Sequence, residues 1–154
     1  MSEGAACHVE HAQALRLTLP WPPSVNTYWR SIVLPKKRHA TVLISEQGRE
    51  YRKTVAWYCS SFTVKNWAEA HRAQPMAVQI LAYPPDRRAR DLDNILKSLL
   101  DSLTHAAVFR DDSDIWDLRV TRACVSAPPG RVMLKIQPFQ IGGVDSVAYM
   151  AQSS

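Results

Sequence analysis

Alternation of apolar and polar positions predicts four strands in this chain. Residues 15–19 alternate leucine with polar side chains, and the proline-rich segment that follows ends this first strand. Residues 76–83 (MAVQILAY) form a second apolar segment, which two prolines close. Residues 115–125 and 131–136 have the pattern of two further strands, with a proline and glycine turn at 127–130 between them.

Helical periodicity first appears after Ser45, whose side-chain oxygen can accept a hydrogen bond from the free amides of a helix that begins there. Apolar residues then recur at the spacing of one helix face, and we expect this stripe in the core. The stripe consists of Tyr51, Val55, Tyr58, Cys59 and Phe62. Before this helix, residues 20–38 are rich in proline and aromatic side chains and predict a long surface loop.

The clearest helix is expected over residues 91–107, because six apolar residues recur there at the i, i+3, i+4, i+7, i+8 and i+11 positions. These residues are Leu92, Ile95, Leu96, Leu99, Leu100 and Leu103. The apolar stripe also fixes the opposite side of the helix. Asp93, Lys97 and Asp101 fall together on that polar face, each four residues from the next.

The order strand, helix, strand, helix, strand, strand predicts an α+β fold: a mixed β-sheet with two main helices packed on one face. A chain of 154 residues is long enough for one domain with its own core. We expect a flexible leader over residues 1–13, a single domain over residues 14–138 and a flexible tail over residues 139–154.

Composition places the chain among globular proteins, since 46% of its residues are hydrophobic and 21% are charged. No apolar run approaches the roughly 18 residues of a membrane span, and the N-terminus lacks the pattern of a signal peptide. We therefore expect a cytoplasmic protein without membrane contact. The cysteines Cys7, Cys59 and Cys124 are scattered, and no Cys or His spacing suggests a zinc site.

The charges are arranged as an acidic focus among basic flanks. A net charge of +5 and a pI near 9.3 favour polyanionic partners. Basic residues gather at 36–39, at 87–90 and at Arg119 and Arg122, whereas acids concentrate at 91–93 and 111–117. This distribution is typical of a nuclease.

The acids offer a ligand set for a hard cation. Mg²⁺ prefers oxygen ligands and keeps several waters, so two or three carboxylates from Asp91, Asp93 and Asp112 suffice to bind it. Such an ion can activate water and neutralise charge that builds on a phosphodiester during hydrolysis. Lys97 lies one turn beyond Asp93, where its ammonium could contact the scissile phosphate.

Structural alternatives exist for each of these residues. Asp91 or Asp93 could be the N-cap of the helix, although one aspartate suffices for a cap and a second brings repulsion. Asp93 and Lys97 could form a surface ion pair worth only about 0.3–0.5 kcal/mol. Residues 111–114 (DDSD) could be a polar turn that leads into a strand.

The basic and aromatic residues also allow two interpretations. The basic segment Lys36, Lys37, Arg38 and His39 could be a solvated turn or could contact phosphates. We also expect Arg87, Arg88 and Arg90 to contact DNA. The aromatic residues of the preceding segment could form a small core or stack on bases exposed at a branch point, with core packing favoured for the first of them. These aromatic residues are Trp21, Tyr28 and Trp29.

Several of these segments together resemble the RusA family of Holliday junction resolvases. The resemblance rests on residues 19–28 (LPWPPSVNTY), 45–52 (SEQGREYR) and 85–94 (PDRRARDLDN), and it continues through Lys97 and the acids up to Val120. It covers about residues 15–136. The DRRxRDLDN run is specific, whereas PPS and DD are weak signals.

The resemblance implies a homodimeric α+β endonuclease that binds four-way DNA junctions and makes paired incisions with Mg²⁺ or Mn²⁺. Carried over by position, the family's catalytic acids fall on Asp91, Asp93 and Asp112, and its essential lysine falls on Lys97. Asp111, beside the third acid, is a less certain ligand. The resemblance also fits a bacterial or prophage origin.

Two other functions remain open at this stage. A metal site does not report the shape of its substrate, so a nuclease of similar chemistry could act on flaps or other branched DNA. The chain could also be a DNA-binding module without catalysis, although the presence of the three acids and Lys97 argues against this.

Overall fold

A computed structural model of the chain describes residues 8–10, 14–33 and 40–140. Its main sheet has five strands in the order β1-β2-β7-β5-β6. In sequence order these are β1 (His8–Glu10), β2 (Ala14–Pro20), β5 (Met76–Tyr83), β6 (Ile115–Arg122) and β7 (Arg131–Pro138). β5 and β6 run parallel, and the other neighbouring strands are antiparallel, so the sheet is mixed, as predicted.

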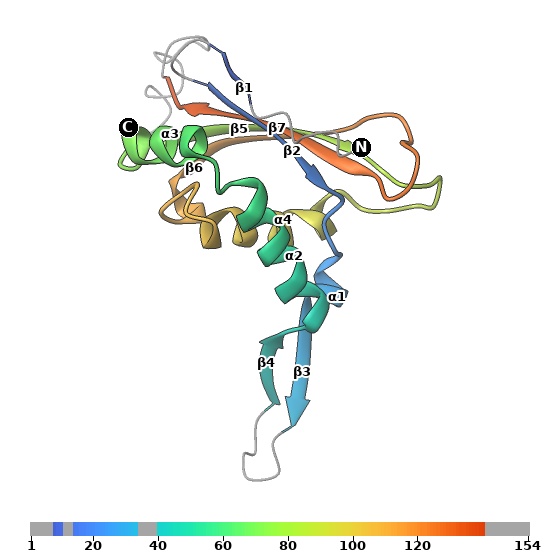
Figure 1. The fold of residues 1–154 in the computed structure, drawn as a ribbon. Coiled ribbons are helices and arrows are strands. Elements are labelled where there is room, and N and C mark those ends of the chain that lie inside the picture. The colour runs from blue at the N-terminus through green and yellow to red at the C-terminus, as the bar shows by residue number, and fades with distance from the viewer. Residues whose placement is uncertain (1–7, 11–13, 34–39, 141–154) are drawn as a thin grey trace, which may run out of the picture.

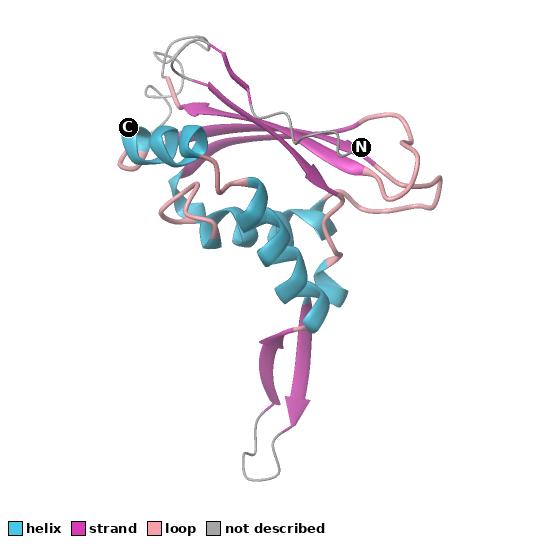
Figure 2. Ribbon diagram, viewed as in Figure 1, coloured by secondary structure: helices cyan, strands magenta, loops and turns pink. Residues whose placement is uncertain are grey.

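The helices lie on one side of this sheet (Figures 1 and 2). The two long helices are α2 (Glu46–Tyr58) and α4 (Asp93–His105), which pack against each other, and α3 (Phe62–His71) follows α2. A short α1 (Val25–Tyr28) contacts both long helices. The 3-10 helix η1 (Asp112–Asp114) precedes β6. The α+β fold with a mixed sheet is confirmed.

The core forms between the sheet and the helices, where one face of β2, β5 and β7 meets the apolar stripe of α4. Alternate residues of the strands point into it, because successive side chains of a strand point to opposite faces. These residues include Leu15, Leu17, Leu19, Val78, Ile80, Val132, Leu134 and Ile136, with Val55, Leu99 and Leu103 from the helices. On the other face of the sheet, the paired residues Leu81 and Met133 are 41% and 40% exposed.

The ends of the chain lie mostly outside the described residues. Within the expected leader, residues 8–10 form β1 and pair with β2. Of the expected tail, only residues 139 and 140 are described. Over the described part of the chain, no helix has the length and apolar character that crossing a bilayer requires.

The prediction of a long loop over residues 20–38 was wrong. α1 and β3 (Trp29–Val33) form within it, and β3 pairs antiparallel with β4 (Ala40–Ile44) in a separate two-stranded sheet. The amides of Thr27 and Tyr28 both bond to the Ser24 carbonyl, which closes the α1 turn directly after the prolines. In Figure 1 the β3–β4 hairpin projects away from the main sheet, beyond the helices. Residues 34–39 lie outside the described residues.

The predicted apolar stripe was right for its first part only. Tyr51, Val55 and Cys59 are buried, but α2 ends at Tyr58 and Phe62 is 79% exposed. The Ser61 side chain accepts a hydrogen bond from the Val64 amide and starts α3 there. Because α3 is a separate helix with its own cap, the apolar spacing that continues from α2 into α3 does not describe one helix face.

This correction predicts different stabilities for two core-pattern residues. Phe62→Ala should change the free energy of unfolding by no more than about 0.5 kcal/mol, as expected for an exposed position. Leu99→Ala should lower it by about 2–5 kcal/mol, because it opens a cavity in the core. Urea denaturation of both variants checks this. If Phe62→Ala lowered the free energy of unfolding by more than about 2 kcal/mol, the Phe62 side chain would be part of the core after all.

Candidate metal and nucleic-acid site

Two carboxylates are exposed to solvent where the chain enters α4, one before its N-cap and one in its first turn. Leu92 occupies the N-cap position, and Asp91 and Asp93 on either side of it are exposed. Neither carboxylate accepts a hydrogen bond from the first-turn amides, and neither is ion-paired with another described residue. The structure therefore does not use these acids as side-chain caps, and their charges are available for a ligand.

The connection that leads from β5 into α4 is held by one carboxylate. Asp86 binds the Arg90 guanidinium through both oxygens, with a distance of 2.8 Å between Arg90 Nη2 and Asp86 Oδ2. It also accepts a hydrogen bond of 2.9 Å from the Arg88 amide. The Arg90 guanidinium and this amide hold the pKa of the Asp86 carboxyl far below its usual range. Asp86 thus stabilises the turn that immediately precedes Asp91.

The same connection packs against the loop between β6 and β7. The Ser126 amide donates to the Pro84 carbonyl at 2.9 Å. Gly130 has a φ of +76°, and a Cβ there would lie 2.8 Å from the Pro85 nitrogen. Only glycine adopts this conformation without cost and leaves room for the backbone of the connection. The Arg122 side chain also donates to the Arg90 carbonyl.

Lys97 joins α4 to η1. Its Nζ lies 2.9 Å from Oδ1 of Asp101 and 3.4 Å from Oδ2 of Asp112. The hydrogen bond to Asp101 and the charges of both acids raise the pKa of Lys97, so its ammonium stays protonated at neutral pH. The ion pair with Asp93 considered from the sequence does not form; Lys97 pairs with the acid one turn later and with η1 instead.

The two neighbouring acids of η1 have different surroundings. Asp111 is its N-cap and accepts a 2.9 Å hydrogen bond from the Ser113 amide. The bonds from Ser113 lower the pKa of the Asp111 carboxyl. Asp111 therefore has the role expected for a polar turn, whereas Asp112 is directed to Lys97.

The predicted acids are not gathered into one ligand cage. Among the described residues, no three His, Cys, Asp or Glu side chains lie close enough to hold one metal ion. The structure brings Asp112 to Lys97 and places Asp91 and Asp93 at the start of the same helix. Their chemistry still fits a hard cation, because all are carboxylates, and Asp91 and Asp93 are exposed and have no ion-pair partner among the described residues.

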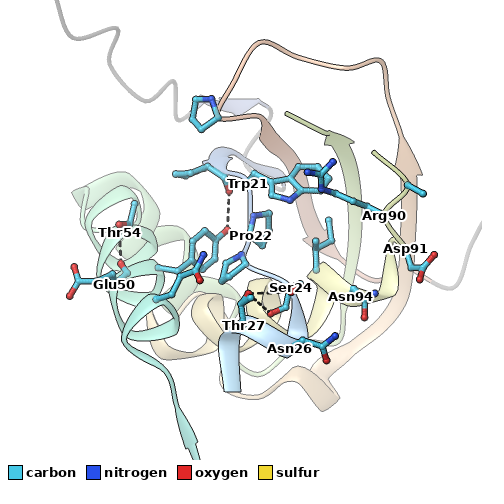
Figure 3. Close-up of a pocket in the computed structure, with 17 residues that line it drawn as sticks. Trp21, Pro22, Ser24, Asn26, Thr27, Glu50, Thr54, Arg90, Asp91 and Asn94 are labelled. Atoms are coloured by element: carbon cyan, nitrogen blue, oxygen red, sulfur yellow. Dashed lines mark hydrogen bonds between the residues drawn. The ribbon is translucent and has the colours of Figure 1, made fainter. Parts of the chain in front are cut away.

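A pocket of about 630 Å³ opens beside Asp91. Figure 3 shows Glu50 and Thr54 of α2 on one side and Arg90, Asp91 and Asn94 on the other. Trp21, Pro22, Ser24, Asn26 and Thr27 lie between these two sides.

The structure describes only some of the basic and aromatic residues that the sequence suggested as DNA contacts. Arg87 and Arg88 are exposed, while Arg90 is half-buried and pairs with Asp86. Lys36, Lys37 and Arg38 lie outside the described residues. Of the aromatic side chains, Tyr28 is fully buried with its hydroxyl accepting a hydrogen bond from Arg52, whereas Trp21 is half-buried and lines the pocket.

Two site residues were not recognised from the sequence. Asp86 stood out only as part of a motif, and Asp101 only as a polar-face residue. Each lies four positions from the cation that it binds, Arg90 and Lys97 respectively. That i,i+4 spacing of opposite charges was the available signal.

Known proteins are similar to this chain over most of its length. The family described as "Endodeoxyribonuclease RusA" matches residues 20–137. The chain is 40% identical over 125 residues to the crossover junction endodeoxyribonuclease of Enterobacteria phage HK97, covering 81% of this chain and 95% of that protein. It is 37% identical over 121 residues to that of Escherichia coli K12, covering 78% and 91%. The chain belongs to the RusA family.

Proposed function

We propose that this chain is an endodeoxyribonuclease that resolves four-way (Holliday) DNA junctions in recombination and repair. The relatives that it matches over most of their length are named crossover junction endodeoxyribonucleases. The observation that carries the proposal is the start of α4, where exposed Asp91 and Asp93 precede Lys97, which contacts Asp112. A bacterial or prophage protein acting in the cytoplasm fits the sources of these relatives, which are phages and Escherichia coli.

Asp91, Asp93 and Asp112 are the proposed ligands of Mg²⁺ or Mn²⁺, with Asp111 as a weaker candidate because the η1 amide already binds it. When bound, the ion activates a water and stabilises negative charge on the phosphate. Lys97 stays protonated beside Asp112, so its ammonium can donate a hydrogen bond to a phosphate oxygen. Asp101 acts through Lys97, because it holds the ammonium toward η1.

One assay separates this proposal from the two other functions. Pure protein is incubated with labelled four-way, flap and linear duplex DNA, with and without Mg²⁺. A resolvase cuts the four-way junction at paired positions and needs the ion. Preference for the flap identifies a nuclease for other branched DNA, and binding without any cleavage identifies a DNA-binding module.

The metal-site proposal predicts that Asp93→Asn retains junction binding but does not cleave. The rate of cleavage should fall by more than about 100-fold. Loss of a residue that only hydrogen-bonds to a metal ligand already costs up to about 100-fold, and loss of a ligand itself should cost more. Binding should persist or improve, because a charge that repels phosphates is removed. Asp91→Asn and Asp112→Asn should behave alike in a cleavage and gel-shift assay.

Asp114→Asn is the matched control, since Asp114 belongs to the same 3-10 helix but pairs with Arg110 at 2.9 Å. It should cut junctions at nearly the wild-type rate. If the three ligand variants cut at the wild-type rate in Mg²⁺, the proposed metal site is wrong.

Neutralising Lys36 and Lys37 should weaken DNA binding regardless of sequence. Removal of each phosphate interaction should flatten the salt dependence of log K by about 0.9 per unit of log salt concentration. Lys65→Gln, an exposed change on α3, serves as the control and should leave the slope unchanged. Binding titrations at several salt concentrations test this. Equal slopes for the Lys36 and Lys37 variant and the wild type would make the basic segment a solvated turn.

We also propose that the chain acts as a two-fold symmetric homodimer. Resolution requires cuts on two opposing strands, and one chain offers one set of acids at the start of α4. Two-fold assembly is the commonest oligomer and matches the approximate symmetry of a junction. Light scattering should give the mass of a dimer, and a cruciform plasmid should be linearised. A monomeric mass with singly nicked products would contradict the dimer.

A further inference from the structure

We propose that the pocket beside Asp91 binds one unpaired nucleobase of the junction, next to the phosphate that is cut. The proposal rests on the proposed function and adds a recognition site for the DNA to it. The pocket volume of about 630 Å³ lies within the roughly 300–1,000 Å³ of small-ligand sites. It is formed by α1, α2, the β5–α4 connection and the proline segment that follows β2.

The lining has the chemistry of a base-binding site. Trp21 and the prolines beside it supply flat apolar surface, on which any base can stack. Asn26, Gln47 and Asn94 carry side-chain amides, which both donate and accept hydrogen bonds. A nucleobase combines a π-face with an edge of donors and acceptors, so both parts of the lining have a counterpart on it.

The charges of the lining disfavour a phosphate inside the pocket. Arg90 is the one cationic side chain among the described lining residues, and Asp86 already binds it through both oxygens. The lining also contains two acids, Asp91 and Glu50, of which Glu50 pairs with Lys53 at 2.7 Å. No unpaired cation of the described lining is therefore available to bind an anionic group inside the pocket, whereas a neutral base needs none.

The backbone segment that carries Trp21 is hydrogen-bonded at both ends. The Tyr51 hydroxyl donates to the Pro20 carbonyl at 3.0 Å, and the Ser98 hydroxyl donates to the Pro23 carbonyl at 2.6 Å. Ser98 is fully buried on α4, and Tyr51 is buried on α2. Both main helices thus hold the backbone on either side of Trp21 before a ligand enters, which reduces the ordering cost of binding.

The position of Asp91 links the pocket to the chemistry. Asp91 is a proposed metal ligand and also lies at the edge of the pocket in Figure 3. A phosphate held at Asp91 would therefore have its own nucleoside, or the adjacent one, beside the opening. Bases that are already unpaired at the branch point enter such a pocket at the lowest cost.

The proposal is tested with a thermodynamic cycle that combines a substitution in the protein with a missing base in the DNA. The cycle measures binding affinity, so it does not depend on cleavage. Junctions carry one abasic residue at successive positions around the cut site, and their dissociation constants are measured with wild-type protein and with Trp21→Ala. At one position the abasic residue should weaken wild-type binding about 5-fold to 150-fold, the effect of one base–aromatic stack. Trp21→Ala should weaken binding to intact DNA by a similar factor, and the abasic residue at that position should weaken it no further.

Further variants serve as controls for this experiment. Trp57→Ala removes an indole that is 69% exposed and does not line the pocket, so it should leave both the affinity and the abasic effect unchanged. Trp21→Phe should retain most of the binding and the coupling, because an aromatic face remains. If Trp21→Ala does not fold, Asn26→Ala on the exposed side of α1 should show coupling at the same DNA position.

The outcomes separate the pocket from the proposed function. Coupling at one position without junction cleavage would reject the resolvase and retain the base site. Junction cleavage, with protein and DNA changes that weaken binding independently at every position, would reject the base site and retain the resolvase.

Discussion

Burial of one side of α4 is the constraint on which the rest of the site depends. Leu99 and Leu103 have no exposed surface, and their contact with the sheet and α2 fixes the rotation of the helix about its axis. With 3.6 residues per turn, this rotation directs Lys97 outward toward η1. It also buries Ser98, whose hydroxyl holds the proline segment that carries Trp21. One packing interaction therefore positions both the proposed catalytic face and one wall of the pocket.

Sequence patterns predicted the elements correctly where one face of the element is buried. β2, β5, β7 and α4 show the alternation or the stripe that burial imposes, so their sequences specify them. The β3–β4 hairpin lacks such a signal, because the adjacent residues Val42 and Leu43 of β4 are 57% and 46% exposed. The prediction for Phe62 failed for a different reason: a local hydrogen bond to Ser61 starts a new helix, and periodicity does not reveal that break.

Some parts of the site follow from residues that are close in sequence, and others depend on contacts that only the tertiary fold makes. Asp91, Asp93 and Lys97 stand in one contiguous motif on a strongly periodic helix, so their shared location follows from the sequence. The approach of Asp112 to Lys97 needs the path of the chain from α4 into η1. The pocket needs more still, because its lining comes from residues 20–27, 47–54, 89–95 and 129, which only the tertiary fold brings together.

The pairing of charges within the site has a consequence for the approach of DNA. Arg90 is bound by Asp86 and Lys97 by two acids, whereas Asp91 and Asp93 pair with no described residue. The start of α4 is thus locally negative although the chain carries a net charge of +5. A divalent cation is often the largest charge in such a site and would reverse the local sign. Binding of such an ion and binding of the scissile phosphate would then be coupled, and by thermodynamic linkage each would strengthen the other. Exposed arginines such as Arg87 and Arg88 can attract DNA in general, but they do not remove the repulsion at the start of α4.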